Sequence, residues 1–213
     1  MVQRWNSTSA NKNKNKSGNL KEIKVDIDEG IRVETSLESL GKLKASFEQC
    51  GTTTAGNSSQ VTDGPAGILL ARRSVNKKLG FPIVGRIVGY AVADVPPEII
   101  GIGPAFAIPK VLEKTGMKIY DIDIYELNEA FASQAVYCIN TLKIPIEKVN
   151  PMRGAIELGH PLRCTGARLF STMLSELRRT GKKRGVVSMC IGTGIGAAFV
   201  FEREWRFLIL STI

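Results

Sequence analysis

The sequence predicts a layered α/β domain, because stretches with the composition of strands alternate along the chain with stretches of helical periodicity. The balance of side chains supports this class. Of 213 residues, 43% are hydrophobic and 23% are charged, which is typical of a globular protein. This length is enough for one ordinary domain and part of another.

The first regular elements lie before residue 93. Residues 66–72 are predicted to form a buried strand or the start of a helix. Residues 74–79 are predicted as a short helix that ends at Gly80. Residues 83–92 are rich in β-branched side chains and are predicted as a strand.

The next elements are a helix, a strand and a second helix. Residues 104–114 are predicted as a helix with proline in its first turn, and Pro109 inside it predicts a kink or a short first segment. The alternation of Asp and Ile in residues 121–127 indicates a strand, and Asn128 is a good N-cap for the helix that follows. One face of that helix is predicted to carry Phe131, Ala135, Cys138 and Leu142.

The last elements are a long helix and two strands. The helix opens at residues 159–161 and ends at Gly181, after a basic cluster that favours the negative end of the helix dipole. Residues 185–190 and 197–201 are apolar and are predicted as strands joined by the glycine-rich turn 191–196. The buried stripe of the helix is predicted to be Phe170, Met173, Leu174 and Leu177.

The charge and the termini exclude several classes of protein. The net charge of +9 suits a phosphate-rich partner, but five lysines lie in the single polar stretch 12–24 and no zinc-finger spacing or RNA-binding aromatic motif accompanies them. We therefore expect no nucleic-acid partner. The chain has no apolar run of about 18 residues, so no membrane span is expected. Residues 1–18 lack the apolar core of a secretory signal, and residues 1–29 are predicted to be a polar, disordered segment.

The four cysteines are Cys50, Cys138, Cys164 and Cys190. They are widely spaced and form no CxxC pair, which argues against a zinc site or a disulfide scaffold and favours a reducing compartment. We expect no metal.

His160 is the only histidine and lies between a glycine and a proline. Because proline disfavours the α region for the residue before it, we expect an extended backbone whose imidazole projects from the turn. A neutral imidazole can take a proton near neutral pH, as a general base for a thiol must. The alternative is a histidine that only caps or packs at a helix end.

Cys190 ends an apolar strand and precedes Gly-Thr-Gly-Ile-Gly. Glycines permit close approach of a substrate, and their N–H groups can face a developing oxyanion. A thiol there can act as acid or base, or it can be a small buried apolar group. Asn128 is either an N-cap or the holder of a water in an oxyanion site, and Ser59 is either a loop hydroxyl or a contact to a cofactor.

Five segments together resemble the thiolase family. Their residues resemble those of the peroxisomal 3-ketoacyl-CoA thiolases, those of plants in particular. They are Thr-Ala-Gly-Asn-Ser-Ser-Gln-Val from Thr54, Gly-Ile-Gly-Pro from Gly101, Asn-Glu-Ala-Phe-Ala-Ser-Gln from Asn128, Gly-His-Pro from Gly159 and Ser-Met-Cys-Ile-Gly-Thr-Gly from Ser188. The resemblance runs from about residue 30 to residue 202 and corresponds to the later portion of a thiolase.

The resemblance implies an acyltransferase of fatty-acid β-oxidation that cleaves a 3-ketoacyl-CoA with CoA through an acyl-enzyme. It implies that His160 activates the nucleophilic cysteine, that Cys190 exchanges a proton with the α-carbon, and that Asn128 and Gly192 serve the two oxyanion holes. It also implies that Ser59 and Phe131 line the path of CoA, which is a co-substrate; no permanently bound cofactor is implied.

The sequence departs from the family pattern in two respects. The family nucleophile lies in a Cys-Ser-Ser-Gly context, and none of the four cysteines here has that context. Arg153, Glu157 and Arg163 stand at usually small positions near the Gly-His-Pro turn, and Arg163 is expected in the first turn of the helix that presents His160, where it could displace the histidine. The alternative to an enzyme is thus an inactive, truncated thiolase that binds CoA weakly or pairs with intact subunits. We expect this chain alone to be inactive.

For the fold, the resemblance implies a mixed five-stranded sheet with helices on both faces. Residues 30–80 would be a remnant of the loop domain and the end of the N-terminal domain, residues 81–203 the C-terminal domain, and residues 204–213 an unrelated tail. Family members are dimers or tetramers, so a homodimer is expected. A peroxisomal location is implied by kinship alone, because no targeting signal is seen.

Overall fold

The computed structural model describes residues 11–14, 20–23, 30 and 32–204, and the chain divides into two compact units, Met1–Ser36 and Leu37–Ile213. In the first unit, β1 (Asn11–Lys14) pairs antiparallel with β2 (Leu20–Ile23). The rest of the polar segment predicted at residues 1–29, and all of the predicted tail except residue 204, lie outside the described residues.

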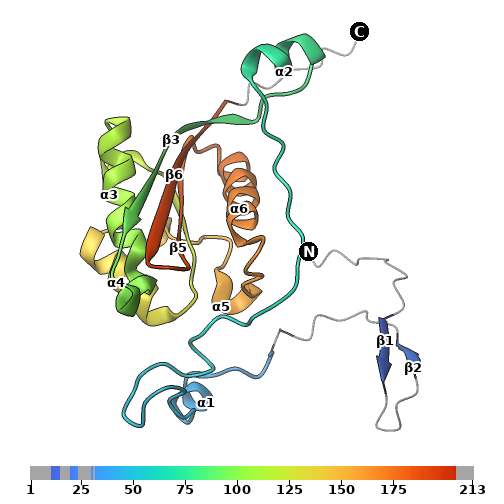
Figure 1. The fold of residues 1–213 in the computed structure, drawn as a ribbon, viewed down its shortest axis with the longest axis vertical. Coiled ribbons are helices and arrows are strands. Elements are labelled where there is room, and N and C mark those ends of the chain that lie inside the picture. The colour runs from blue at the N-terminus through green and yellow to red at the C-terminus, as the bar shows by residue number, and fades with distance from the viewer. Residues whose placement is uncertain (1–10, 15–19, 24–29, 31, 205–213) are drawn as a thin grey trace. The chain divides into compact units, whose positions relative to one another are not determined.

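The second unit is built on a mixed four-stranded sheet of order β3–β6–β5–β4 (Figure 1). The strands are β3 (Gly85–Asp94), β4 (Ile124–Leu127), β5 (Arg184–Ile191) and β6 (Ile195–Arg203). β4 and β5 run parallel, and the other neighbours run antiparallel. The predicted α/β class with a mixed sheet is confirmed.

The sheet has four strands where the resemblance implied five. Beyond β4, a single parallel bridge joins Val149 to Tyr125. The side-chain amide of Asn150 then bonds both the N–H and the C=O of Leu127 at 2.8 Å, as a neighbouring strand would. One amide side chain therefore satisfies backbone groups of β4 that a fifth strand would otherwise pair.

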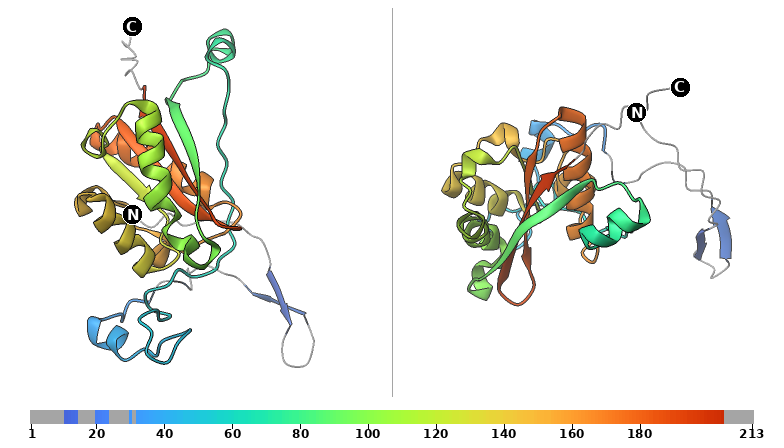
Figure 2. Two further views of the ribbon diagram at one scale, coloured as in Figure 1. Left: turned by 60° about the vertical axis from the view of Figure 1, so that its left-hand side comes forward. Right: turned by 90° about the horizontal axis from the view of Figure 1, so that it is seen from above.

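Helices cover both faces of the sheet (Figures 1 and 2). On one face lie α3 (Gly103–Thr115) and α4 (Ala132–Leu142), whose buried residues pack with Val186, Ala198 and Val200 of the sheet. On the other face lies α6 (Thr165–Thr180). The shorter helices are α1 (Leu37–Gly41), α2 (Arg73–Leu79), α5 (Ala155–Leu158), and the 3-10 helices η1 (Pro97–Ile102), η2 (Ile119–Asp121) and η3 (Ile146–Lys148).

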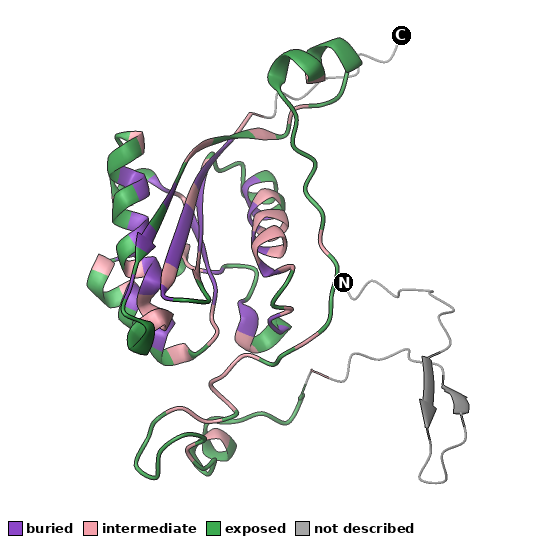
Figure 3. Cartoon of the chain, in the orientation of Figure 1, coloured by how far each residue is buried: buried purple, intermediate pink, exposed green. Residues whose placement is uncertain are grey.

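The buried stripe of α6 follows the predicted period. Met173 and Leu177 are fully buried, and Phe170 and Leu174 are partly buried against the same cluster. Leu169 is also buried and was missed from the prediction. Burial therefore concentrates on the strands and on the inward faces of the helices (Figure 3).

The predicted helix ends are confirmed by backbone conformation. Gly80, Gly116 and Gly181 follow α2, α3 and α6 with φ of 68°, 67° and 72°, the left-handed region that glycine adopts without steric cost. Pro109 lies inside α3, which continues through it as one helix, so the alternative of a short first segment is not observed.

Three other predictions of secondary structure were wrong. Residues 66–72 form neither strand nor helix, and their apolar side chains are exposed because no described strand pairs with them. The strand predicted at 121–127 begins only at Ile124 and is buried on both faces, so it does not alternate. Asn128 is not an N-cap: Phe131 precedes α4, and Asn128 lies fully buried in the turn before it.

The free edge of the sheet at β3 is covered by lysines. Lys110 and Lys114 on α3 donate to the carbonyl oxygens of Val92 and Tyr90 at 2.8 and 3.2 Å. Charged side chains at an edge oppose pairing with a further strand. Among the described residues, no helix has both the length and the apolar character to cross a bilayer.

Candidate functional site

The candidate site lies where β4 and β5 end side by side. The strands are parallel, with Leu127 in register with Ser188, so their carboxyl ends meet at one edge of the sheet. Asn128 follows β4 and donates its backbone N–H to the carbonyl oxygen of Ser188 at 3.0 Å. Cys190 stands two residues further along β5. The topology thus brings Asn128 and Cys190 to the same edge.

The backbone of His160 is held in place by pairing with the segment that contains Gln60 and Val61. It forms a parallel bridge with Val61, and its N–H donates to the carbonyl oxygen of Gln60 at 2.8 Å. This extended pairing agrees with the restriction that Pro161 imposes. His160 is only 7% exposed, so its imidazole lies inside the protein.

The hydrogen bonds of the imidazole identify its basic nitrogen. Nδ1 lies 2.6 Å from Oγ1 of Thr165, and that hydroxyl donates to the carbonyl oxygen of Pro161 at 2.9 Å. Since the hydroxyl proton is used, Oγ1 must accept from Nδ1–H. The lone pair is then on Nε2, which lies 3.2 Å from Nδ2 of Asn128.

Electrostatics keep this imidazole neutral. Burial lowers the pKa of His160, and the positive charge of Arg168 lowers it further. A neutral ring with its lone pair on Nε2 is the state that a general base requires.

Cys190 is connected to the histidine through Asn128 and Gln134. Its Sγ lies 4.0 Å from Oε1 of Gln134, whose Nε2 donates to the backbone oxygen of Asn128 at 3.3 Å. Burial raises the pKa of the Cys190 thiol, so it stays protonated at neutral pH. The site therefore combines a neutral base with a protonated acid.

The glycine-rich turn has two different parts. Nothing lies within 4 Å of the position that a side chain at Gly192 would take, so a ligand can approach there. Gly196 instead packs against Gly103 so closely that any side chain at Gly196 would overlap the backbone of the α3 start. The first glycine is open to a ligand, whereas Gly196 serves packing.

Ser59 and Phe131 lie beside the Asn128 turn. The N–H of Ser59 donates to the carbonyl oxygen of Ala130 at 2.9 Å, and Ser58 bridges Phe131. The Phe131 ring meets that of Phe47 edge to face, with centroids 5.9 Å apart. Both residues predicted on the CoA path thus belong to one loop cluster next to the site.

Several residues that organise the site were not predicted. Gln134 and Glu129 belong to the segment that begins at Asn128, and Thr165 follows His160 by five residues. Asn150 donates to Oε1 of Glu129 at 2.5 Å. Their proximity in sequence to the quoted motifs was the available signal. Within the described residues, no group of three or more His, Cys, Asp or Glu is arranged to hold a metal ion.

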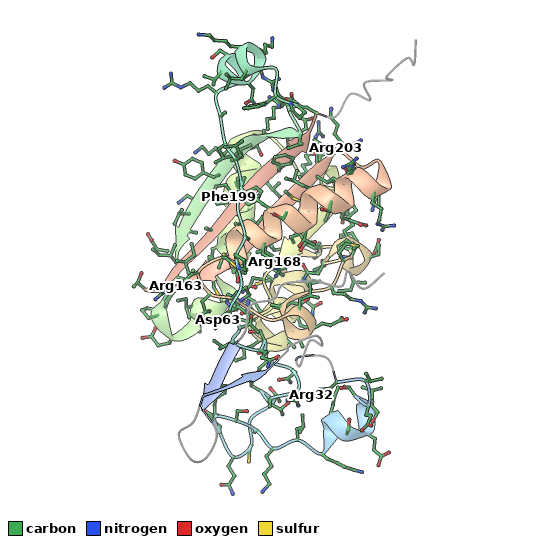
Figure 4. All side chains as sticks on the ribbon, turned by 90° about the vertical axis from the view of Figure 1, so that its right-hand side faces the viewer. Arg32, Asp63, Arg163, Arg168, Phe199 and Arg203 are labelled. Carbon is green, nitrogen blue, oxygen red and sulfur yellow. The ribbon has the colours of Figure 1, made fainter. Side chains whose placement is uncertain are left out.

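The three departures near the Gly-His-Pro turn lie outside this network. Arg153 has φ of 79° and its Nε lies 3.4 Å from Oε2 of Glu157, so two of the unusual residues face each other. Arg163 is exposed and precedes α6, which begins at Thr165 (Figure 4). The prediction that this helix opens at residues 159–161 was wrong, and so was the expectation that Arg163 lies in its first turn.

Comparison with known proteins adds evidence of kinship. The family model "Thiolase, C-terminal domain" matches residues 81–203, and "Thiolase, N-terminal domain" matches residues 9–74. The chain is 61% identical over 189 residues to peroxisomal 3-ketoacyl-CoA thiolase B of Mus musculus. The aligned region covers 88% of this chain and 45% of that protein. The chain therefore spans less than half the length of this relative.

Two solved structures share the fold. The dimeric peroxisomal thiolase of Saccharomyces cerevisiae aligns with a TM-score of 0.79 and 56% identity over 90% of this chain and 47% of that chain. Human mitochondrial 3-ketoacyl-CoA thiolase in complex with CoA aligns with a TM-score of 0.78 and 40% identity over 85% of this chain and 46% of that chain.

Proposed function

This chain belongs to the thiolase family, and we propose that it contributes the base, His160, and the acid, Cys190, of a site that cleaves a 3-ketoacyl-CoA with CoA. The products would be acetyl-CoA and a shortened acyl-CoA, as in fatty-acid β-oxidation, and the location peroxisomal, as in its relatives. A homodimer is proposed by analogy with the dimeric yeast structure. We propose that residues 30–80 are a remnant of the loop domain and the end of the N-terminal domain, and that residues 81–203 are the C-terminal domain.

The proposed mechanism assigns two proton transfers to this chain. Nε2 of His160 takes the proton of the acyl-accepting thiol, which then attacks the 3-keto carbon. The C2–C3 bond breaks, and its electron pair on C2 takes the proton of the Cys190 thiol, which releases acetyl-CoA. CoA then gives its thiol proton to the Cys190 thiolate, and its sulfur attacks the acyl carbon. The bond between the acyl group and the enzyme thiol breaks, and the released thiolate takes back the proton held on Nε2 of His160. Asn128 and Gly192 would stabilise the two oxyanions, and Ser59 and Phe131 would line the path of CoA.

One observation carries this proposal: the basic Nε2 of His160 faces Asn128, and Asn128 is linked through Gln134 to the protonated thiol of Cys190. A base and an acid with opposite pKa shifts at one edge of a sheet are what a reversible proton exchange at carbon needs.

The test measures the thiolysis of acetoacetyl-CoA by the loss of its enolate absorbance. We expect no turnover by the chain alone, and turnover when a thiolase N-terminal domain with its Cys-Ser-Ser-Gly segment is supplied as a separate polypeptide. His160→Ala and Cys190→Ala should each abolish that turnover. Turnover that persists in both variants would overturn the assignment of base and acid.

A second candidate is a non-catalytic member that binds CoA or pairs with intact thiolase subunits. It is favoured by one observation, that none of the four cysteines precedes Ser-Ser-Gly. Absence of turnover in every combination, together with calorimetric binding of CoA that Phe131→Ala weakens, would support this candidate over the first.

A further inference from the structure

A buried carboxyl group on β4 and a partly buried guanidinium on α6 face each other, outside the residues assigned above. Glu126 is the third residue of β4 and is fully buried, and neither of its carboxylate oxygens has a hydrogen-bond partner among the described residues. Burial raises the pKa of this carboxyl group, and the charge of Arg168 opposes that rise. Such a group is costly to bury, so its position calls for an explanation.

Arg168 lies in the first turn of α6, with its side chain 18% exposed (Figure 4). Its Nη1 is 3.7 Å from Oε2 of Glu126, and its three side-chain nitrogens are buried without a hydrogen-bond partner in the described part of the chain. Arg168 also interacts electrostatically with Glu129 and Cys164. The two side chains therefore lie against each other at 3.7 Å without a hydrogen bond between them.

The same two elements carry both neighbours of the imidazole. On β4 and the residue after it, Glu126 and Asn128 are two positions apart and therefore lie on the same side of the sheet. On α6, Thr165 and Arg168 are three positions apart and therefore lie on the same side of the helix. His160 closes the ring, since Nδ1 contacts Thr165 and Nε2 contacts Asn128. A shift of α6 against β4 would change both contacts at once.

We propose that Glu126 and Arg168 are a positioning pair, which sets the start of α6 against the end of β4 and so aims the His160 ring at Asn128. The inference rests on the proposed role of His160 as a base. The imidazole contacts the side chains of Asn128 and Thr165, which are uncharged, and Arg168 is the one charged group that shifts its pKa.

The single histidine makes the test direct. In the untagged chain, the Cε1–Hε1 signal of His160 is the only one of its kind, so NMR titration reports its pKa, and the ¹⁵N shifts of the ring report its tautomer. For the chain as it stands, we expect the Nδ1–H tautomer. Arg168→Met should raise the pKa of His160, because it removes the one charged group that shifts this pKa, and should mix the tautomers. Arg168→Lys should retain the charge effect and lose part of the tautomer preference.

Glu126→Gln keeps the size of the side chain and replaces the carboxyl group by an amide that cannot ionise, and we expect mixed tautomers there too. The matched control is Arg179→Met, which breaks the ion pair of Arg179 with Glu176 on the same helix and should leave the His160 signal unchanged. Wild-type pKa and tautomer in folded Arg168→Met and Glu126→Gln would overturn the proposal. Should Arg168→Met fail to fold, an unchanged tautomer in Arg168→Lys and Glu126→Gln decides against it equally.

The outcome is independent of turnover. If the His160 signal responds as expected but the thiolysis assay with the supplemented chain shows nothing, the positioning pair stands and the proposed activity fails. If thiolysis depends on His160 but the signal is insensitive to Glu126 and Arg168, the activity stands and the positioning pair fails.

Discussion

Among the residues that the structure describes, four other than glycine have a positive φ: Lys143, Asn150, Arg153 and Thr193. Arg153 has a φ of 79°, a conformation that is costly for a residue with a side chain. The ion pair with Glu157 offsets little of this free-energy cost, because both side chains are more than half exposed.

Arg153→Gly should therefore stabilise the protein by about 1 kcal/mol, since it relieves a strained backbone at the loss of a weak surface pair. Urea denaturation followed by circular dichroism measures this change. Glu157→Gln, which breaks the same pair without altering the backbone, is the control and should change the free energy of unfolding by less than about 0.5 kcal/mol. A destabilised Arg153→Gly would show that the ion pair outweighs the strain.

The individual side chains of the site were predictable to different degrees. His160, Cys190 and Asn128 could be proposed from their motifs, because a lone histidine before proline and a thiol before glycines are informative on their own. Gln134 and Thr165 were not proposed, because an ordinary glutamine or threonine in a helix carries no such signal. Their importance comes from contacts, Gln134 with Asn128 and Cys190, and Thr165 with His160.

At the scale of elements, β6 is tied to its neighbours at one end by an ionic network. Glu202 on β6 is 8% exposed in its side chain and lies 2.6 Å from Arg86 of β3 and 2.9 Å from Lys183, next to β5. Hydrogen bonds from Lys183 and Arg86 lower the pKa of Glu202 to about 2. The network joins three consecutive neighbours of the sheet.

This pKa shift predicts a pH dependence of stability. The folded pKa lies below the ordinary value of 4.5, so the stabilisation is fully present above about pH 4.5 and is lost as the pH falls toward 2. Glu202→Gln should be less stable than the wild type by about 1–2 kcal/mol at pH 7, a figure reduced because both cations are largely exposed.

The difference between Glu202→Gln and the wild type should shrink as the pH is lowered from 4.5 to 2, as measured by thermal unfolding across that range. The control is Glu113→Gln, an exposed acid on α3, which should behave as the wild type at every pH. A difference that stays constant down to pH 2 would contradict the assigned pKa shift.

Elements were predicted well where periodicity and caps agreed. The helices that end at Gly80, Gly116 and Gly181 and the strands β3, β5 and β6 follow their patterns. The prediction failed at residues 66–72. An apolar run indicates that its side chains would be stabilised by burial, but it does not show whether another strand or helix packs against them. It also failed at the start of β4. There the N–H of Asp123 donates to the carbonyl oxygen of Arg184, but the N–H groups of Lys183 and Arg184 donate to the side-chain carboxylate of Asp123 and not to a strand backbone.

At the scale of the whole molecule, apolar side chains are exposed around α2 and the segment before it (Figure 3). Leu69 and Leu70 are 86% and 68% exposed and line a hollow of about 560 Å³ together with residues 82–87. Exposed apolar groups of this kind mark surfaces that associate with other chains or bind apolar dyes.

We predict that replacement of both leucines by lysine lowers the binding of a fluorescent apolar dye without lowering the Tm, because neither side chain is buried in the core. Dye titration and differential scanning calorimetry test the two parts. The matched control is Leu169→Ala on α6, which should lose about 2–5 kcal/mol of stability, because that side chain is fully buried. A large loss of Tm in the double lysine variant would show that this surface is packed.

The sequence by itself determined the α/β class, the order of most elements, the ends of three helices and kinship to thiolases, because periodicity, caps and motifs are local properties of the chain. Only the tertiary structure decided that Nε2 of His160 faces Asn128, that Gln134 links Asn128 to Cys190, and that Glu126 faces Arg168. These pairs are 32, 56 and 42 residues apart, and no local pattern encodes how a helix and a strand so far apart in sequence pack together.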